Sequence, residues 1–153
     1  MKMLAVLLGI MMAFIVNAQD LKEINGLYYS NNSLYSGEYI TSYKNGNIKM
    51  QAHFLNGKKD GTFKLFYENG NVHEYRSYKN NEMHGIWLTF NAKGTKVSEA
   101  SYLNGKKDGK WHIWNDEGQL IYELSYTNGE KSGVWKSYNE FGTVLNERNY
   151  AAL

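Results

Sequence analysis

One unit of this sequence reads Gly61-Thr-Phe-Lys-Leu-Phe-Tyr67, then Glu68-Asn-Gly70, then Asn71-Val-His-Glu-Tyr-Arg-Ser-Tyr78. Two runs rich in aromatic and β-branched residues flank a short loop that ends in glycine, which is the pattern of a β-hairpin. Glycine suits the end of such a loop because that position takes a left-handed conformation. The unit therefore predicts two antiparallel strands.

The hairpin unit occurs five times with a strict period of 24 residues. Self-similarity at such a period is typical of stacked repeats, in which each unit buries its surface against its neighbours. Two glycine columns and one aromatic column recur: Gly37, Gly61, Gly85, Gly109 and Gly133; Gly46, Gly70, Gly94, Gly118 and Gly142; and Phe54, Tyr78, Tyr102, Tyr126 and Tyr150. The predicted repeats are residues 37–60, 61–84, 85–108, 109–132 and 133–153.

The linkers between units predict a chain reversal after every strand. They begin with Asn-Gly or Asn-Asn, at residues 56–61, 80–85, 104–109 and 128–133. Asn and Gly tolerate positive φ and favour tight turns. Loops this short cannot form a parallel crossover, which needs a dozen or more residues. We therefore expect an all-β fold: an elongated, single-layer antiparallel β-meander of about ten strands.

Period-2 alternation along the strands places aromatic residues on both faces. One face is expected to carry Tyr39, Phe63, Trp87, Trp111 and Trp135, and the other Ser42, Phe66, Phe90, Trp114 and Tyr138. The same alternation assigns four aliphatic residues to the face of the column from Phe54 to Tyr150: Ile48, Val72, Leu120 and Val144. Apolar residues on both faces favour an open ribbon over half of a sandwich.

The N-terminus has the features of a signal peptide. Lys2 precedes the apolar run Leu4–Val16, and cleavage is expected between Ala18 and Gln19. We interpret residues 1–18 as a signal peptide of an exported, periplasmic or secreted protein with no transmembrane segment after cleavage. An uncleaved N-terminal anchor is the alternative.

Both ends of the repeat array are expected to be capped. Residues 19–36 are predicted to form an N-terminal capping half-repeat. At the other end, the polar residues Glu147, Arg148 and Asn149 are expected to discourage edge-to-edge pairing of the last strand.

Composition argues against several classes of function. The chain has no cysteine and a formal net charge of +2, so thiolate chemistry is excluded and a nucleic-acid footprint is not expected. The histidines occupy four different positions of the repeat, and none has the spacing of a zinc motif: His53, His73, His84 and His112. No glycine-rich phosphate loop or nucleophile elbow is present in the sequence. We expect no cofactor, no metal and no catalytic site.

Two charged sets recur with the repeat. Glu99, Glu123 and Glu147 share one column, but neighbouring units are too far apart for one calcium ion, so we expect a solvated position paired to lysines or to Arg148. Four linker lysines could contact an anionic surface, although we interpret them as solvated turn residues: Lys58, Lys59, Lys106 and Lys107.

The tryptophans are the candidate binding residues. Trp87, Trp111 and Trp135 are expected to form a ladder, with Trp114 on the opposite face. Large aromatic residues can cover a thin sheet, and they are also enriched at binding hot spots. The structural interpretation is preferred, and both roles can coexist on a single-layer sheet.

The unit Tyr/Phe-x-Asn-Gly-x-x-x-Gly-x-Trp/Phe, followed by an aromatic residue and a glycine-closed turn, resembles the MORN-repeat variant family. The resemblance covers about residues 37–150. Bacterial members are often labelled antitoxin components. The resemblance implies a β-hairpin repeat used as an interaction scaffold, usually without catalysis.

We therefore expect an exported, non-enzymatic repeat scaffold whose partner is most simply a protein. One alternative is an immunity protein that neutralises a toxin encountered outside the cytoplasm. Another is a module that binds a cell-envelope glycan through its aromatic ladders.

Overall fold

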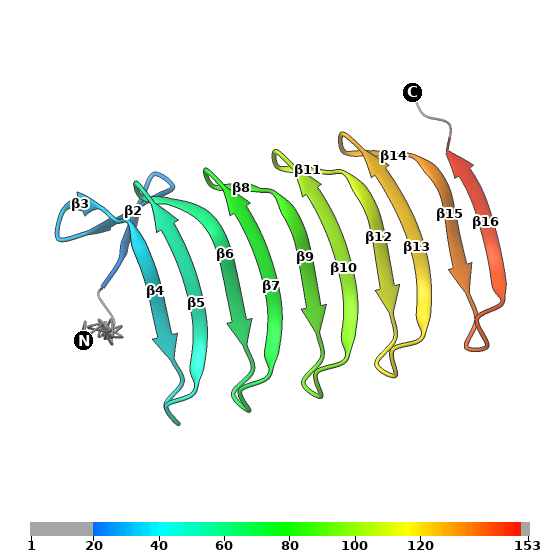
Figure 1. Cartoon of the computed structure of the whole chain (residues 1–153), viewed down its shortest axis with the longest axis horizontal. Coiled ribbons are helices and arrows are strands. Elements are labelled where there is room, and N and C mark those ends of the chain that lie inside the picture. Colours follow the sequence, from blue (N-terminus) through cyan, green and yellow to red (C-terminus); the bar gives the residue numbers. More distant parts are fainter. Residues whose placement is uncertain (1–19, 151–153) are drawn as a thin grey trace, which may run out of the picture.

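The computed structural model describes residues 20–150, which form β-strands without any helix (Figure 1). The predicted signal peptide, residues 1–18, and its cleavage site at Ala18 and Gln19 lie outside the described residues. The strands are β1 (Lys22–Ile24), β2 (Leu27–Ser30), β3 (Ser33–Leu34), β4 (Gly37–Ser42), β5 (Ile48–Leu55), β6 (Lys58–Phe66), β7 (Val72–Lys79), β8 (Glu82–Met83), β9 (Gly85–Phe90), β10 (Lys96–Leu103), β11 (Lys106–Lys107), β12 (Gly109–Trp114), β13 (Leu120–Thr127), β14 (Glu130–Lys131), β15 (Gly133–Tyr138) and β16 (Val144–Tyr150).

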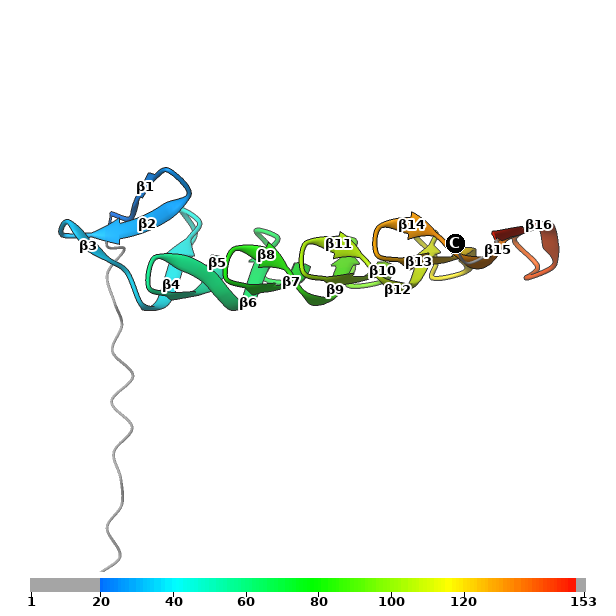
Figure 2. The same ribbon diagram turned by 90° about the horizontal axis from the view of Figure 1, so that it is seen from above.

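The long strands form one open antiparallel sheet, as predicted. Its order is β4-β5-β6-β7-β9-β10-β12-β13-β15-β16, so every long strand pairs with the next long strand along the chain. The two-residue strands β8, β11 and β14 lie in the linkers and pair with the ends of β7, β10 and β13. Figure 2 shows that these linkers arch over the same side of the sheet. We call this side the linker face and the opposite side the open face.

The first repeat carries the most buried residues. Phe54 is 2% exposed and Ala52 is 1% exposed, and Phe63 packs beside them. The small sheet β1-β2-β3 covers this cluster from the linker face, where Leu21 and Tyr28 pack against it (Figure 2). Elsewhere in residues 20–150 the only other buried hydrophobic residue is Ala100. Stability must therefore come mainly from contacts between neighbouring repeats.

The turns use the expected residues. Gly46 closes the first hairpin loop at φ +90°, and the linker residues Asn56 and Gly57 both have positive φ. Gly57 is also in a crowded place, because a Cβ there would lie 2.6 Å from Leu34 Cδ2 and 3.0 Å from the Tyr28 carbonyl oxygen. Gly46 has no atom within 4 Å of such a Cβ.

Gly57→Ala is therefore expected to destabilise the protein more than Gly46→Ala. Both substitutions put alanine in a left-handed conformation, at a cost of about 1–2 kcal/mol. Gly57→Ala adds overpacking against Leu34 and the backbone, worth about 1–3 kcal/mol more. Urea unfolding of the two variants measures the difference, and equal losses of stability would contradict the crowding argument.

A bulge near the turn corrects one prediction about the faces. In the hairpin of β6 and β7, Leu65 pairs with Glu74 but Phe66 pairs with Val72, so the register shifts by one residue. The extra residue interrupts the alternation and turns Val72 to the open face. The same shift places Ile48, Leu120 and Val144 opposite Ser42, Trp114 and Tyr138. The prediction that these four aliphatic residues share the face of Phe54 and Tyr150 is wrong.

Candidate binding surfaces

An unbroken aromatic ladder runs along the linker face. Consecutive ring centroids are 4.6–5.4 Å apart. The ladder consists of Tyr28, Phe54, Phe63, Tyr78, Trp87, Tyr102, Trp111, Tyr126, Trp135 and Tyr150. Each ring after Phe54 is supplied by the strand next to that of the preceding ring. The ladder therefore joins each pair of neighbouring repeats through edge-to-face or tilted aromatic contacts.

The indole groups of the ladder are bonded to the backbone. Trp111 Nε1 donates to the Ser101 carbonyl at 3.0 Å, and the N–H of Asp108 donates to the same oxygen at 3.0 Å. The same double acceptance occurs at Ser77, from Trp87 and His84, and at Ser125, from Trp135 and Ser132. The rings and the indole N–H groups of these three tryptophans are thus all engaged in contacts within the fold.

Linker lysines cover the ladder from above. Lys107 Nζ lies 4.4 Å from the Trp111 ring centroid and 4.8 Å from that of Tyr126. Lys131 lies similarly over Trp135, at 4.6 Å, and Lys59 lies 5.4 Å from the Tyr78 centroid. Cation–π attraction of this kind stabilises the linker on the sheet. The interpretation of Lys59 and Lys107 as purely solvated is therefore wrong, while Lys106 is exposed.

A second apolar column follows the hairpin-turn end of the open face. It alternates aromatic and other side chains from neighbouring strands, and Lys96 Nζ lies 4.3 Å from the Trp114 ring centroid. A cavity of ≈ 370 Å³ opens within it, lined by Val72, Leu88 and Phe90 among others. We call this column the open-face stripe: Phe66, Val72, Phe90, Lys96, Trp114, Leu120, Tyr138 and Val144. No linker arches over it (Figure 2).

Ion pairs run beside the open-face stripe. Glu99 pairs with Lys96 at 2.6 Å and Glu147 with Lys136 at 3.6 Å, which confirms the expected lysine partners. Glu123 accepts a hydrogen bond from the Tyr138 hydroxyl and lies 3.8 Å from His112 Nε2. The other expected partner of this column, Arg148, instead lies against the Tyr150 ring, 5.0 Å from its centroid.

The bond from Tyr138 to Glu123 predicts an alkaline loss of stability. The hydrogen bond to Glu123, with a smaller contribution from burial, raises the pKa of Tyr138 to about 12 from an ordinary value of 10.0. The unfolded state therefore loses this proton first as the pH rises. The stabilisation is complete below pH 10.0 and is lost by about pH 12. Tyr138→Phe should flatten this part of the stability-against-pH curve, and an unchanged curve would contradict the assignment.

The four histidines do not converge. His53 Nδ1 lies 2.7 Å from the Asp60 carbonyl oxygen, while His73 stacks on Tyr67 with centroids 4.4 Å apart. Within residues 20–150 no group of three His, Asp or Glu side chains is arranged to hold a metal ion.

His84 interrupts a series of hydrogen bonds between successive linkers. Asp60 Oδ2 accepts from the N–H of Asn80 at 3.1 Å, and Asp108 Oδ2 accepts from the N–H of Asn128 at 3.0 Å. His84 holds the equivalent position at the end of the second repeat. Its Nδ1 is buried and has no hydrogen-bond partner among the described residues.

His84→Asp is therefore expected to stabilise the protein. A carboxylate at this position can accept the N–H of Asn104, as Asp60 does for Asn80. One such bond contributes about 0.5–1.5 kcal/mol, and the substitution also removes an unsatisfied buried nitrogen. His84→Ala is the control, because it removes the ring without supplying an acceptor. Urea unfolding should give His84→Asp a higher free energy of unfolding than both His84→Ala and the wild type. The opposite order would refute the argument that a carboxylate here bonds the next linker.

These repeats match a known family model. The model described as MORN repeat variant matches residues 35–56, 59–80, 107–128 and 131–152, more than half of the chain. The chain belongs to the MORN repeat variant family. The last three matched units begin in linkers, the first begins just before β4, and all four end near a ladder tyrosine or phenylalanine. The unmatched third repeat has the same hairpin, formed by β9 and β10.

Membership bears on the kind of function. MORN repeats are non-enzymatic repeat modules, and they suggest a scaffold for protein or membrane interactions. A search of curated proteins finds no match to the chain. Among residues 20–150, no helix is long and apolar enough to cross a membrane.

Proposed function

We propose that this protein is an exported, non-enzymatic scaffold that binds a partner protein along its open face. The observation that carries the proposal is the open-face stripe. It presents aromatic and aliphatic side chains across four successive repeats on the side of the sheet that the linkers leave uncovered.

The two faces differ in what they can offer a partner. On the linker face, Trp111 and its neighbours already contact rings, lysines and backbone carbonyls. On the open face, Phe90 and Trp114 are half-buried. The linkers lie on the opposite side of the sheet. Aromatic residues in such positions are typical hot spots, and the adjacent ion pairs resemble the polar rim of a protein interface.

The pull-down experiment uses the mature chain, residues 19–153, as bait for the envelope fraction of its native cell. Phe90→Ala and Trp114→Ala should each lower the yield of a specific captured protein about tenfold or more, as expected for hot-spot residues. Lys110→Ala is the matched control, because Lys110 is exposed on the open face but lies outside the stripe. Recovery of background alone, or equal yields from all variants, would count against the proposal.

Export is supported by the N-terminal sequence, with Lys2, the apolar run Leu4–Val16 and the small residue Ala18. Cell fractionation followed by N-terminal sequencing tests it. The expected result is an extracytoplasmic chain that begins at Gln19. A full-length chain in the cytoplasm would refute export.

An immunity role is one form of this function, with an extracytoplasmic toxin as the partner protein. It predicts that deletion of the gene increases sensitivity to a toxic product of a neighbouring gene. The glycan hypothesis has weaker support, because the rings of Trp87, Trp111 and Trp135 pack against tyrosines within the ladder and cannot stack freely on sugars.

A further inference from the structure

The outer edge of β16 has unpaired backbone groups. Within residues 20–150, β16 pairs with β15 and with no other strand. In the preceding repeat the Ser125 carbonyl points toward the next linker, because it accepts the N–H of Ser132. The N–H and C=O of one residue in an antiparallel strand point to the same side. Asn149 lies one repeat after Ser125, and Glu147 is two residues before it on the same strand. The N–H and C=O groups of Asn149 and Glu147 therefore point outward from β16.

The last hairpin also exposes apolar side chains. Phe141 is 83% exposed and Leu145 is 67% exposed, the two highest values among the exposed large hydrophobic residues of the described part. The residue equivalent to Phe141 is polar in the other four repeats: Asn45, Asn69, Lys93 and Glu117. An exposed edge strand is normally protected by charge or by proline. β16 carries the charged residues Glu147 and Arg148, yet it also has exposed apolar residues beside its open edge.

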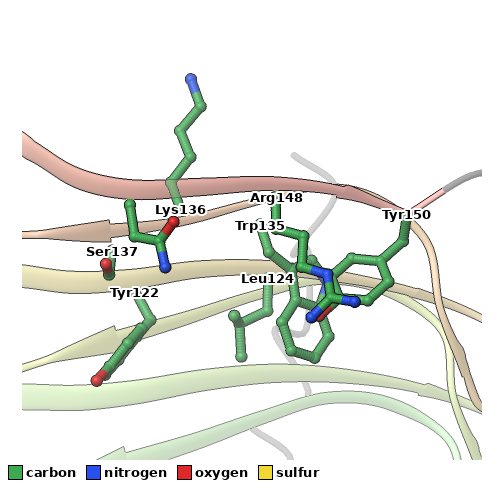
Figure 3. A pocket seen from close by; sticks show the side chains of 8 residues that line it. Tyr122, Leu124, Trp135, Lys136, Ser137, Arg148 and Tyr150 are labelled. Carbon is green, nitrogen blue, oxygen red and sulfur yellow. The ribbon is translucent and has the colours of Figure 1, made fainter.

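A cavity of ≈ 220 Å³ adjoins this strand on the linker face (Figure 3). Tyr122, Leu124 and Trp135 form one part of its lining, and Arg148 and Tyr150 of β16 form another. Figure 3 shows the Arg148 side chain lying beside the Tyr150 ring. The cavity can therefore receive a side chain from a strand placed against β16.

The internal junctions show what such a strand would carry. At the junction of β13 and β15, Glu123 pairs with Lys136, and Trp135 lies 5.2 Å from Tyr126. Trp135 also donates to the Ser125 carbonyl. One repeat later, on β16, Glu147 corresponds to Glu123 and Tyr150 corresponds to Tyr126. The Asn149 carbonyl corresponds to that of Ser125. The fitting strand carries an aromatic residue followed directly by a basic residue.

Two registers of a second copy of β16 are disfavoured at this edge. In an antiparallel pair, residues that lie opposite each other are on the same face of the sheet. Two copies of β16 can therefore pair only in registers in which one central residue lies opposite the same residue of the other copy. The registers centred on Glu147 and Arg148 place Glu147 against Glu147 or Arg148 against Arg148. Like charges directly opposite each other are destabilising.

We propose that a partner protein adds an antiparallel β-strand to the outer edge of β16, with an aromatic side chain against Tyr150 and a basic side chain opposite Glu147. Phe141 and Leu145 contact the partner beyond the strand. This mode of binding rests on the proposed protein-scaffold function and adds a second contact, at the end of the sheet, to the open-face stripe.

The first test uses a synthetic peptide with the sequence of residues 128–138, which contains Trp135 and Lys136. The fluorescein-labelled peptide should bind the mature chain in an anisotropy titration and protect the amides of Glu147 and Asn149 from hydrogen exchange. A peptide with alanine in place of its tryptophan should bind about tenfold more weakly. Equal binding of the two peptides, or no protection of either amide, would overturn the proposal.

Variants of the chain test the edge itself. Asn149→Pro removes an outward N–H and should abolish peptide binding, whereas Asn149→Ala should leave it unchanged; proline is tolerated on an exposed strand edge. Glu147→Lys should weaken the original peptide and restore binding to a peptide with glutamate at the position of Lys136. Thermal unfolding of each variant verifies the fold. Binding that is insensitive to Asn149→Pro would refute strand addition.

Two further outcomes separate this proposal from the scaffold function. Partner capture that is lost in Trp114→Ala but unaffected by Asn149→Pro would leave the scaffold function standing and overturn strand addition. Sedimentation of the free chain as a dimer that Asn149→Pro dissociates would show that the edge holds a second copy, and this too would overturn the proposal.

Discussion

Phe54→Ala is expected to lower the free energy of unfolding by about 3–5 kcal/mol, the range for removing a buried phenylalanine ring. Phe54 is 2% exposed. Its ring contacts those of Tyr28 and Phe63, with centroids 4.6 and 5.2 Å away, and those of Tyr35 and Tyr39 at 5.9 and 6.4 Å. No other ring of the ladder has as many aromatic neighbours among the described residues, so its loss removes more ring contacts than any other single truncation of the ladder.

Urea unfolding followed by tyrosine and tryptophan fluorescence measures this loss. Leu55→Ala is the matched control, because Leu55 is the next residue and is 47% exposed. It should change stability by no more than about 0.5 kcal/mol. A similar effect of both substitutions would show that the first repeat has no true core.

Phe54→Ala should also loosen the N-terminal sheet. Tyr28 and Leu21 attach that sheet to the first repeat through the cluster around Phe54. Hydrogen exchange is therefore expected to increase at β2, where the N–H of Tyr28 donates to the Gly57 carbonyl at 2.8 Å. Amides of β13 should be unaffected, because stacked repeats contact only their neighbours.

Trp111→Ala is expected to cost about 3 kcal/mol, at the lower end of the range for large aromatic truncations because Trp111 is half-buried. The substitution removes ring contacts to Tyr102 and Tyr126, the cation–π contact with Lys107 and the indole hydrogen bond to Ser101. The Ser101 carbonyl keeps its bond from the N–H of Asp108, so no buried acceptor is left unsatisfied. Trp111→Phe keeps the ring contacts and should lose about 1 kcal/mol, the value of one hydrogen bond.

The control for this variant lies on the other face. Trp114 contacts Lys96 and His112 but has no place in the ladder. Trp114→Ala should therefore destabilise the fold less than Trp111→Ala while reducing partner capture more.

Trp111→Ala interrupts the ladder in the middle. It should also split unfolding into two transitions, because coupling between the halves is lost. Equal destabilisation by the two alanine variants would mean that the ladder does not provide the main coupling between repeats.

The repeat, the hairpins and the open sheet could be predicted because they depend on residues close together in the sequence. Gly70 closes a loop, Asn56-Gly57 reverses a linker, and alternation sets the faces of the central strand residues. Each of these signals acts over a few residues and recurs in successive repeats. Local chemistry was thus enough to specify a meander.

The candidate surfaces were less predictable, since they depend on contacts between segments. The one-residue bulge that turns Val72 to the open face has no clear local signal, so alternation alone assigned it wrongly. From the sequence, Lys107 is predicted to be a solvated turn residue. In the structure its linker arches over the sheet and places Lys107 on Trp111. The recurrence of lysine at residues 59, 107 and 131 was the available signal.

The sequence therefore specifies the strands, turns and repeat order, whose physical basis is local conformational preference. The tertiary structure decides which aromatic column is covered and which remains open. That distinction arises because the linkers fold back over one side of the sheet and place their lysines on Trp111 and Trp135. Phe90 and Trp114 lie on the other side of the sheet, which the linkers leave uncovered.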